Sequence, residues 1–298
     1  MILVTGGTGF VGSKVVHALR AEERPVRVLA RRPEKQERLR AWGCEVAHGD
    51  MTEPDSLRRA VEGCEAVVHL AALPPFASPK ATERVMTQGT RDLVAAAKEA
   101  KVERLVLMSA NGVSEETLDV APYYRAKWEM EQEVKRSGLG HVIFRPSFVF
   151  GTEGGQLPQQ LMLARWSPVT PVLGRHRMQP IWVEDVAAFF VGAFSTPAAV
   201  NRTFELGGPD RVTWAELHAE IRKVLGKRRL AFVMPPGLLR VGASVGRVLP
   251  PLRGAPAAVE MLDFGDNVCD PEPAVETFGI QLIGLEEQLR RAVARRGR

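Results

Sequence analysis

The chain has 298 residues, of which 45% are hydrophobic and 25% charged, the ordinary composition of a folded globular protein. The net charge of +5 comes from basic residues spread along the chain, without a stripe of interleaved basic and aromatic residues, so we expect no nucleic-acid binding. No apolar run approaches the roughly 18 residues that a membrane span needs, so we expect no transmembrane segment.

The cysteines give no sign of a metal site or a disulfide framework. Cys44, Cys64 and Cys269 are scattered and odd in number, without metal-ligand spacing. They are typical of reduced thiols. The first residues, "MILVTGG", read as a strand rather than as a basic segment before an apolar one. We therefore expect a cytoplasmic protein without a metal.

The first half of the chain alternates short apolar runs with amphipathic stretches. Strands are predicted at residues 2–6, 26–31, 44–50, 66–72, 104–110 and 141–151, and helices between them at 11–22, 33–43, 53–63, 80–100 and 122–137. Short apolar strands that alternate with such helices form βαβ units. The sequence therefore predicts an α/β fold with a doubly wound parallel sheet, a Rossmann fold.

The second half is less regular, since helix and strand fragments alternate with stretches rich in Pro and Gly. We predict a dinucleotide-binding core at 1–150 and a smaller irregular C-terminal α/β lobe at 151–298, with segments of about 176–195 returning to the core. The stretch 235–252 is apolar, rich in small residues and dotted with Arg. Two interpretations stay open for it: a weak contact with a membrane surface or protein partner, or a cover over the substrate crevice.

A glycine-rich turn follows the first strand and opens the first helix. The stretch "GGTGFVG" comprises Gly6, Gly7, Thr8, Gly9, Phe10, Val11 and Gly12. In this context glycines permit a tight turn and a close approach of the backbone to a pyrophosphate, whose charge the helix N-terminus stabilises. A strand-to-helix turn can also use glycines without a ligand, but the strand at 26–31 lies at the right distance for a dinucleotide.

The residues after the next strands favour NADP. The second strand is followed by Arg31 and Arg32 instead of the acidic residue that selects NAD, and guanidinium groups pair well with a 2′-phosphate. NAD remains the second choice, because both arginines could simply be solvated. Further candidate cofactor residues are Asp50 and Met51, which follow the third strand, and Ala71 and Ala72, which follow the fourth.

These motifs resemble the short-chain dehydrogenase/reductase superfamily, in its extended and atypical branches. The similarity rests on "TGGTGFVG", "GD" at 49–50, "HLAA", Tyr123 and Lys127 four residues apart, "RPSFVFG" and "PIWVEDVA", in the family's order. Within that superfamily the chain looks most like bacterial relatives of the nucleotide-binding accessory subunit of respiratory complex I, often described as epimerase/dehydratase-like or NmrA-like.

The resemblance implies a catalytic scheme. Tyr123 would be the general acid/base, and Lys127 would lower its pKa and hold the nicotinamide ribose, because an unperturbed tyrosine titrates near pH 10. Ser109 would orient the substrate carbonyl, with Asn111 or Ser114 as alternatives. Pro146 and Ser147 resemble the segment beside the nicotinamide.

Two functions follow from this resemblance. The first is an NAD(P)-dependent oxidoreductase or epimerase that acts on an unidentified small carbonyl or alcohol. The second is a non-catalytic NADP(H)-binding sensor or accessory subunit related to complex I.

Overall fold

The computed structural model describes residues 1–166, 169–173, 176–226, 230–234 and 265–294. The stretch 235–252, for which two roles stayed open, lies outside the described residues. Within them, no helix is long and apolar enough to cross a membrane.

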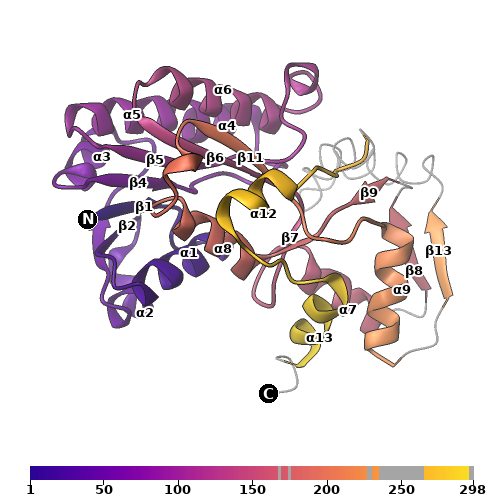
Figure 1. The fold of residues 1–298 in the computed structure, drawn as a ribbon. Helices are drawn as coiled ribbons and strands as arrows, with labels where there is room; N and C mark the ends of the chain where they lie inside the picture. The colour runs from indigo at the N-terminus through magenta and orange to yellow at the C-terminus, as the bar shows by residue number, and fades with distance from the viewer. Residues whose placement is uncertain (167–168, 174–175, 227–229, 235–264, 295–298) are drawn as a thin grey trace.

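A seven-stranded parallel sheet forms the core of the molecule (Figure 1). Its order is β11-β6-β5-β4-β1-β2-β3, and every neighbouring pair is parallel. The strands span Ile2–Thr5 (β1), Val26–Ala30 (β2), Glu45–His48 (β3), Ala66–His69 (β4), Arg104–Met108 (β5), Gly140–Pro146 (β6) and Arg202–Leu206 (β11). The strand order reverses direction between β1 and β4, as in a doubly wound sheet. The predicted Rossmann fold is confirmed.

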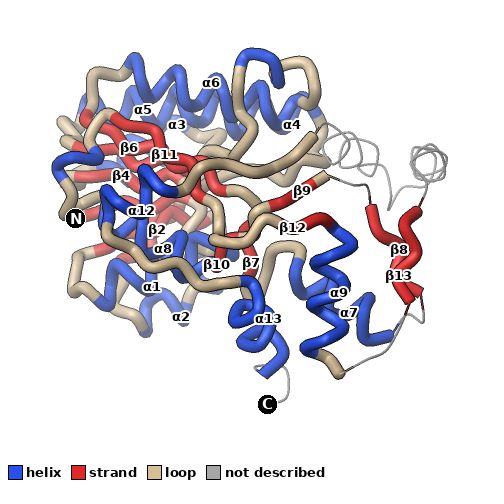
Figure 2. Tube along the Cα trace, turned by 45° about the vertical axis from the view of Figure 1, so that its right-hand side comes forward, coloured by secondary structure: helices blue, strands red, loops and turns tan. Residues whose placement is uncertain are grey.

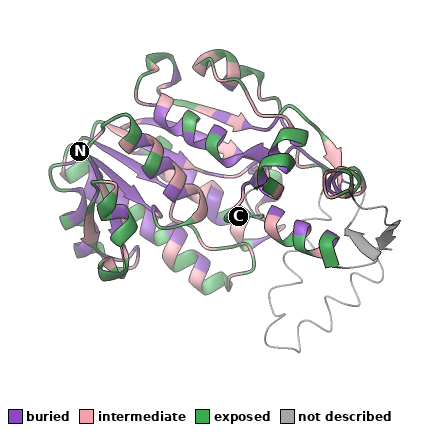
Figure 3. Ribbon diagram, turned by 90° about the horizontal axis from the view of Figure 1, so that it is seen from below, coloured by how far each residue is buried: buried purple, intermediate pink, exposed green. Residues whose placement is uncertain are grey.

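Helices cover both faces of this sheet. One face is covered by α1 (Phe10–Ala21), α2 (Glu37–Ala41), α8 (Val183–Gly192) and α12 (Glu272–Phe278), and the other by α3 (Pro54–Val61), α5 (Gly89–Glu99) and α6 (Pro122–Arg136). Each face buries its own cluster of aliphatic and aromatic side chains, and the strands between them are largely buried (Figure 3). Burial on both faces explains why the strands are short continuous apolar runs rather than alternating ones.

The helix predicted at 80–100 contains a change of winding. It runs from α4 (Pro79–Thr82) through a π-helical stretch, η2 (Glu83–Gln88), into α5. Gly89 lies against Met51, where an added Cβ would come within 2.7 Å of the Met51 carbonyl oxygen. The helix therefore packs closely against the loop after β3.

A smaller group of elements lies beside the carboxyl ends of the strands (Figure 2). Its described residues include the helices α7 (Leu157–Trp166), α9 (Trp214–Val224) and α13 (Leu285–Ala294), and the strands β7 (Val149–Phe150), β8 (Val169–Leu173), β9 (Arg177–Met178), β10 (Ile181–Trp182), β12 (Val212–Thr213) and β13 (Leu230–Met234). A separate apolar cluster joins α7, α9 and α13. Strand β11 pairs with β6 in the main sheet, and α12 packs on that sheet. The predicted division at residue 150 had placed both elements in the second lobe.

Candidate functional site

The glycine-rich turn between β1 and α1 has the backbone that its sequence predicts. Gly6 adopts a φ of 72°, and an added Cβ would lie 2.6 Å from the Ala71 backbone nitrogen. At Gly12 an added Cβ would lie 2.1 Å from the Gly6 carbonyl oxygen. Side chains at these two positions would push the turn away from both β4 and α1, so glycine is required by close packing of the backbone.

A series of hydrogen-bonded, buried polar side chains begins at Thr5, directly before this turn. Thr90 Oγ1 donates to the Met86 carbonyl and therefore accepts from His69 Nε2, 2.9 Å away. His69 Nδ1 is thus the acceptor for Thr5 Oγ1 at 2.7 Å. Burial, and to a lesser degree the charge of Lys127, lowers the pKa of His69 to about 3. The neutral His69 ring therefore connects β4 to Thr5 of β1 and to Thr90 of α5.

A cleft of about 710 Å³ runs along the carboxyl ends of the strands above this turn, and we call it the cofactor cleft. The predicted cofactor residues that line it are Gly6, Thr8, Gly9, Phe10, Val11, Gly12, Arg31, Asp50, Met51, Ala71, Ala72 and Ser147. Gly7 is buried towards Val28 and Val16 instead, and Arg32 is exposed without lining the cleft.

Asp50 is partly committed to its own loop. One of its carboxylate oxygens, Oδ1, accepts hydrogen bonds from both the backbone nitrogen and the hydroxyl of Thr52, each at 2.8 Å. This pair of bonds fixes the carboxylate at the edge of the cofactor cleft and leaves Oδ2 for an outside donor.

A second compartment of about 670 Å³ adjoins the cofactor cleft. The two share a set of lining residues, among them Met108, Tyr123, Ser147 and Phe148. The walls of the second compartment include the aromatic residues Phe76, Tyr124 and Trp214, and its described lining contains no Asp or Glu. Arg177 and His176 are the basic residues in that lining. The compartment therefore suits an apolar molecule that is neutral or negatively charged.

Tyr123 stands where the cofactor cleft and the second compartment meet. Its side chain is half-buried, and burial raises its pKa further above the ordinary value. The Lys127 ammonium lies 5.8 Å from the centre of the Tyr123 ring rather than against its hydroxyl. The phenol is therefore protonated at neutral pH, which is the form that a proton donor needs.

Lys127 lies beneath this junction and is buried. Its ammonium donates to the Met108 carbonyl oxygen at 2.7 Å. Burial lowers the pKa of Lys127 to about 8, and the charge of Glu131 acts in the opposite direction. The lysine is thus held in place by β5, one helical turn from a buried carboxylate.

The other predicted residues take different positions. Ser109 contributes to the wall of the second compartment, but its hydroxyl oxygen is buried and makes no hydrogen bond with a described residue. Pro146 and Asn111 also line the second compartment. Ser114 caps a short 3₁₀ turn, η3 (Glu115–Thr117), and lines neither cavity. Of the predicted catalytic residues Tyr123, Lys127 and Ser109, Tyr123 is therefore the one that lines the cofactor cleft.

Several lining residues were not predicted. Asn267, Trp214 and Gln156 come from the C-terminal half and reach the second compartment only through tertiary packing. Some of the missed residues stood in quoted motifs, among them Gly49 in "GD", Leu70 in "HLAA", and Phe148 and Val149 in "RPSFVFG".

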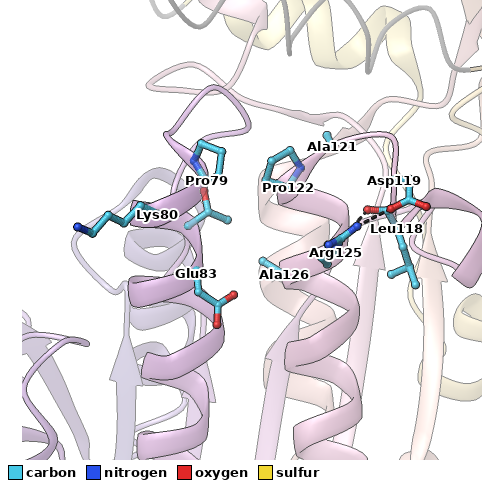
Figure 4. Close-up of a pocket in the computed structure, with 10 residues that line it drawn as sticks. Pro79, Lys80, Glu83, Leu118, Asp119, Ala121, Pro122, Arg125 and Ala126 are labelled. Carbon is cyan, nitrogen blue, oxygen red and sulfur yellow. Dashed lines mark hydrogen bonds and ion pairs between the residues drawn. The ribbon is translucent and has the colours of Figure 1, made fainter.

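A third cavity, of about 470 Å³, lies between the start of α4 and the start of α6 (Figure 4). In Figure 4 the Arg125 guanidinium is paired with Asp119, and Lys80 points away from the gap. No residue of the glycine-rich turn lines this cavity. Among the described residues, no group of three or more His, Cys, Asp or Glu could hold a metal ion.

Comparison with known proteins identifies an NAD(P)H-binding family. A family model described as NAD(P)H-binding matches residues 6–197. The chain is 32% identical to ceramide reductase of Caulobacter vibrioides, over 82% of this chain and 77% of that protein. It is 28% identical to subunit 9 of the NADH dehydrogenase 1 alpha subcomplex of Mus musculus, over 95% and 77%. The predicted resemblance is confirmed.

Solved structures agree with the fold. The NADP(H) complex of a Citrobacter triphenylmethane reductase superimposes with a TM-score of 0.80 at 19% identity, covering 98% of this chain and 99% of that one. An NADPH-dependent quinone oxidoreductase of Escherichia coli gives 0.78 at 21% identity, covering 97% and 98%. At these identities the likeness shows the fold alone.

Proposed function

Because the chain belongs to the family of NAD(P)H-binding proteins, we propose that it is an NADPH-dependent reductase of apolar carbonyl compounds in which Tyr123 donates the proton. The observation that carries the proposal is the position of Tyr123, which lines both the cofactor cleft and the second compartment. A group at this junction can reach a substrate that lies against the cofactor.

The residues of the chain divide the work of such a reaction. The backbone N–H groups of the glycine-rich turn and the start of α1 bind the pyrophosphate, and Arg31 pairs with a 2′-phosphate. Lys127, which is buried and lines neither cavity, would keep a positive charge beneath the junction rather than touch the ribose. When bound, NADPH would supply the hydride for the carbonyl carbon, and the Tyr123 hydroxyl would give its proton to the carbonyl oxygen. The products would be an alcohol and NADP⁺, with solvent returning a proton to Tyr123.

The lining of the second compartment supports an apolar substrate. Trp214 and Phe148 make an edge-to-face contact with ring centres 5.8 Å apart, and Met178 is buried beside them. Burying apolar surface against these groups contributes about 25 cal/mol per Å². The relatives described as ceramide reductase and NAD(P)H azoreductase are also named for reduction, which supports the reaction type.

The test is NADPH oxidation by the purified protein with a panel of aldehydes, aryl ketones, quinones and sugar nucleotides. Tyr123→Phe removes the proton donor and keeps the ring, so we expect kcat to fall by about 10²- to 10⁴-fold, while the Kd for NADPH stays the same. Tyr124→Phe is the matched control, and its loss should be far smaller. A Tyr123→Phe variant as active as the wild type would exclude Tyr123 as the donor.

A second candidate is a non-catalytic NADP(H)-binding subunit. It is favoured by the positions of Ser109, whose hydroxyl oxygen is buried, and of Lys127, whose ammonium is bonded to the backbone. The similarity to a subunit of NADH dehydrogenase supports it as well. Tight binding of NADPH without turnover of any member of the panel would favour this candidate.

A further inference from the structure

Two asparagine side chains from opposite halves of the chain meet on the wall of the second compartment. Asn111 lies in the loop after β5, and Asn267 lies in the segment that leads to α12. Both line the compartment that Tyr123 also lines. The Nδ2 atom of Asn111 lies 3.4 Å from Oδ1 of Asn267, and Nδ2 of Asn267 lies 3.5 Å from the Asn111 carbonyl oxygen.

The orientation of the Asn111 amide follows from its neighbour. The backbone N–H of Gly112 donates at 2.9 Å to Asn111 Oδ1, and a backbone N–H can only donate. The oxygen of this amide must therefore face Gly112, and its NH₂ group must face Asn267. Asn111 is buried, with 4% of its surface exposed, so water contributes little to satisfying this NH₂ group.

The orientation of the Asn267 amide then follows from Asn111. Two NH₂ groups cannot face each other, so Asn267 presents Oδ1 to Asn111. The same oxygen accepts from the Ser147 hydroxyl at 2.6 Å. Both amide oxygens thus accept from donors of the protein, whereas among the described residues each amide nitrogen has one long contact for its two hydrogens. Within the described part of the chain, the pair therefore retains N–H donors, together with one lone pair on Asn111 Oδ1.

The segment that carries Asn267 is held rigidly at this place. Its backbone nitrogen donates to the Arg177 carbonyl oxygen at 2.8 Å, and Asp266 Oδ1 accepts from the Arg177 backbone nitrogen at 2.9 Å. Two residues further on, the Cys269 nitrogen donates to the Gln179 side chain at 2.9 Å. Donors fixed in this way act without a cost of reorganisation.

We infer that the amide N–H groups of Asn111 and Asn267 bind the carbonyl oxygen of an aryl ketone or similar aromatic carbonyl substrate. This inference rests on the proposed reductase function and names the donors that polarise its substrate. The neighbouring rings of Phe148, Trp214 and Tyr124 hold the aromatic part. The amide pair then takes the role that the sequence assigned to Ser109, whose hydroxyl oxygen is buried.

The test uses two ligands of the same shape, 2-acetylnaphthalene and 2-isopropenylnaphthalene, which differ in a C=O against a C=CH₂ group. Their Kd values are measured by calorimetry on the full chain saturated with NADP⁺, so that no turnover occurs. We expect the wild type to prefer the ketone. Asn267→Ala should weaken ketone binding about tenfold, which corresponds to about 1.4 kcal/mol, and leave alkene binding unchanged.

A second variant guards against a loss of folding. Asn267→Asp keeps Oδ1 for Ser147 and Asn111 but replaces the NH₂ group by an oxygen, so it should lose the ketone preference while its thermal unfolding stays near that of the wild type. Gln88→Ala, which removes an exposed amide on η2, is the control and should keep the preference.

The outcomes separate this inference from the proposed function. Loss of the ketone preference in both Asn267 variants supports the inference even if the wild type does not reduce the ketone, a result that would remove only the reductase. A wild type without the preference, or Asn267 variants that retain it, would overturn the inference, whether or not the ketone is turned over.

Discussion

Arg31 is the residue on which we expect cofactor choice to depend. It follows β2 directly, lines the cofactor cleft and is exposed, whereas Arg32 beside it does not line the cleft. The two residues were equivalent in the sequence, because both follow the same strand. A guanidinium at the cleft can pair with the 2′-phosphate that distinguishes NADP from NAD.

We therefore predict that Arg31→Ala weakens the binding of NADPH about tenfold, or by about 1.4 kcal/mol, and leaves the binding of NADH unchanged. Arg32→Ala is the matched control and should change either affinity less. Fluorescence titration of both cofactors measures the effect. Equal affinities of the wild type for NADPH and NADH would refute the role of Arg31.

Helix α6 brings the catalytic candidates and a buried ion cluster together. Tyr123, Lys127 and Glu131 follow one another at intervals of four residues, so they share one side of the helix. Glu131 is fully buried and accepts two hydrogen bonds from Arg145, at 2.8 and 2.7 Å, and one from Lys135 at 3.2 Å. Burial acts to raise the pKa of Glu131, but Arg145 and Ser109 outweigh it and the pKa is lowered. The cluster fixes α6 against β6.

Replacing Glu131 by Gln should leave the partly buried Arg145 guanidinium without the carboxylate that it is bonded to. We expect a loss of about 3 kcal/mol in the free energy of unfolding, measured by urea denaturation at pH 7. Because the pKa of Glu131 is lowered on folding, its stabilisation is present above the unfolded pKa and disappears as the pH falls through the folded value. Glu131→Gln should lack this acid-dependent step.

The control for that experiment is Lys135→Ala, because Lys135 is the partly exposed partner of the same carboxylate. Its loss should stay below about 1 kcal/mol. Equal losses for the two variants would show that the Arg145–Glu131 pair stabilises the fold no more than the Lys135–Glu131 pair does.

A segment near the C-terminus packs into the core of the main sheet. Phe278, at the end of α12, contacts Phe144 of β6, Phe189 of α8 and Phe204 of β11, with ring centres 5.6, 5.5 and 5.1 Å apart. Phe278 therefore completes a cluster in which Phe144 lies 134 positions earlier in the sequence. The aromatic cluster on this face of the sheet is therefore complete only when α12 has packed against it.

Phe278→Ala should consequently destabilise the whole molecule and not only its C-terminal segment. We expect a loss of about 3 kcal/mol and a single unfolding transition at a lower temperature, observed by circular dichroism. Phe76→Ala, at a ring that is 59% exposed, should change stability by less than about 0.5 kcal/mol. An early, separate transition in Phe278→Ala would instead show that α12 unfolds independently.

Local signals were enough to predict the parallel sheet and the glycine-rich turn. The apolar runs, the spacing of Gly6, Gly9 and Gly12, and the four-residue step from Tyr123 to Lys127 lie within single βα units. Their consequences depend on backbone geometry that neighbouring residues determine. The sequence by itself therefore determined the fold and the place of the glycine-rich turn.

Tertiary structure alone decided which groups line the second compartment. Asn267 lies 120 residues after Ser147 and accepts its hydrogen bond, and no periodicity links the two positions. Ser109 directly follows β5, yet its hydroxyl oxygen is buried and makes no hydrogen bond with a described residue. Contacts of this kind depend on how distant elements pack, and such packing leaves no local pattern in the chain.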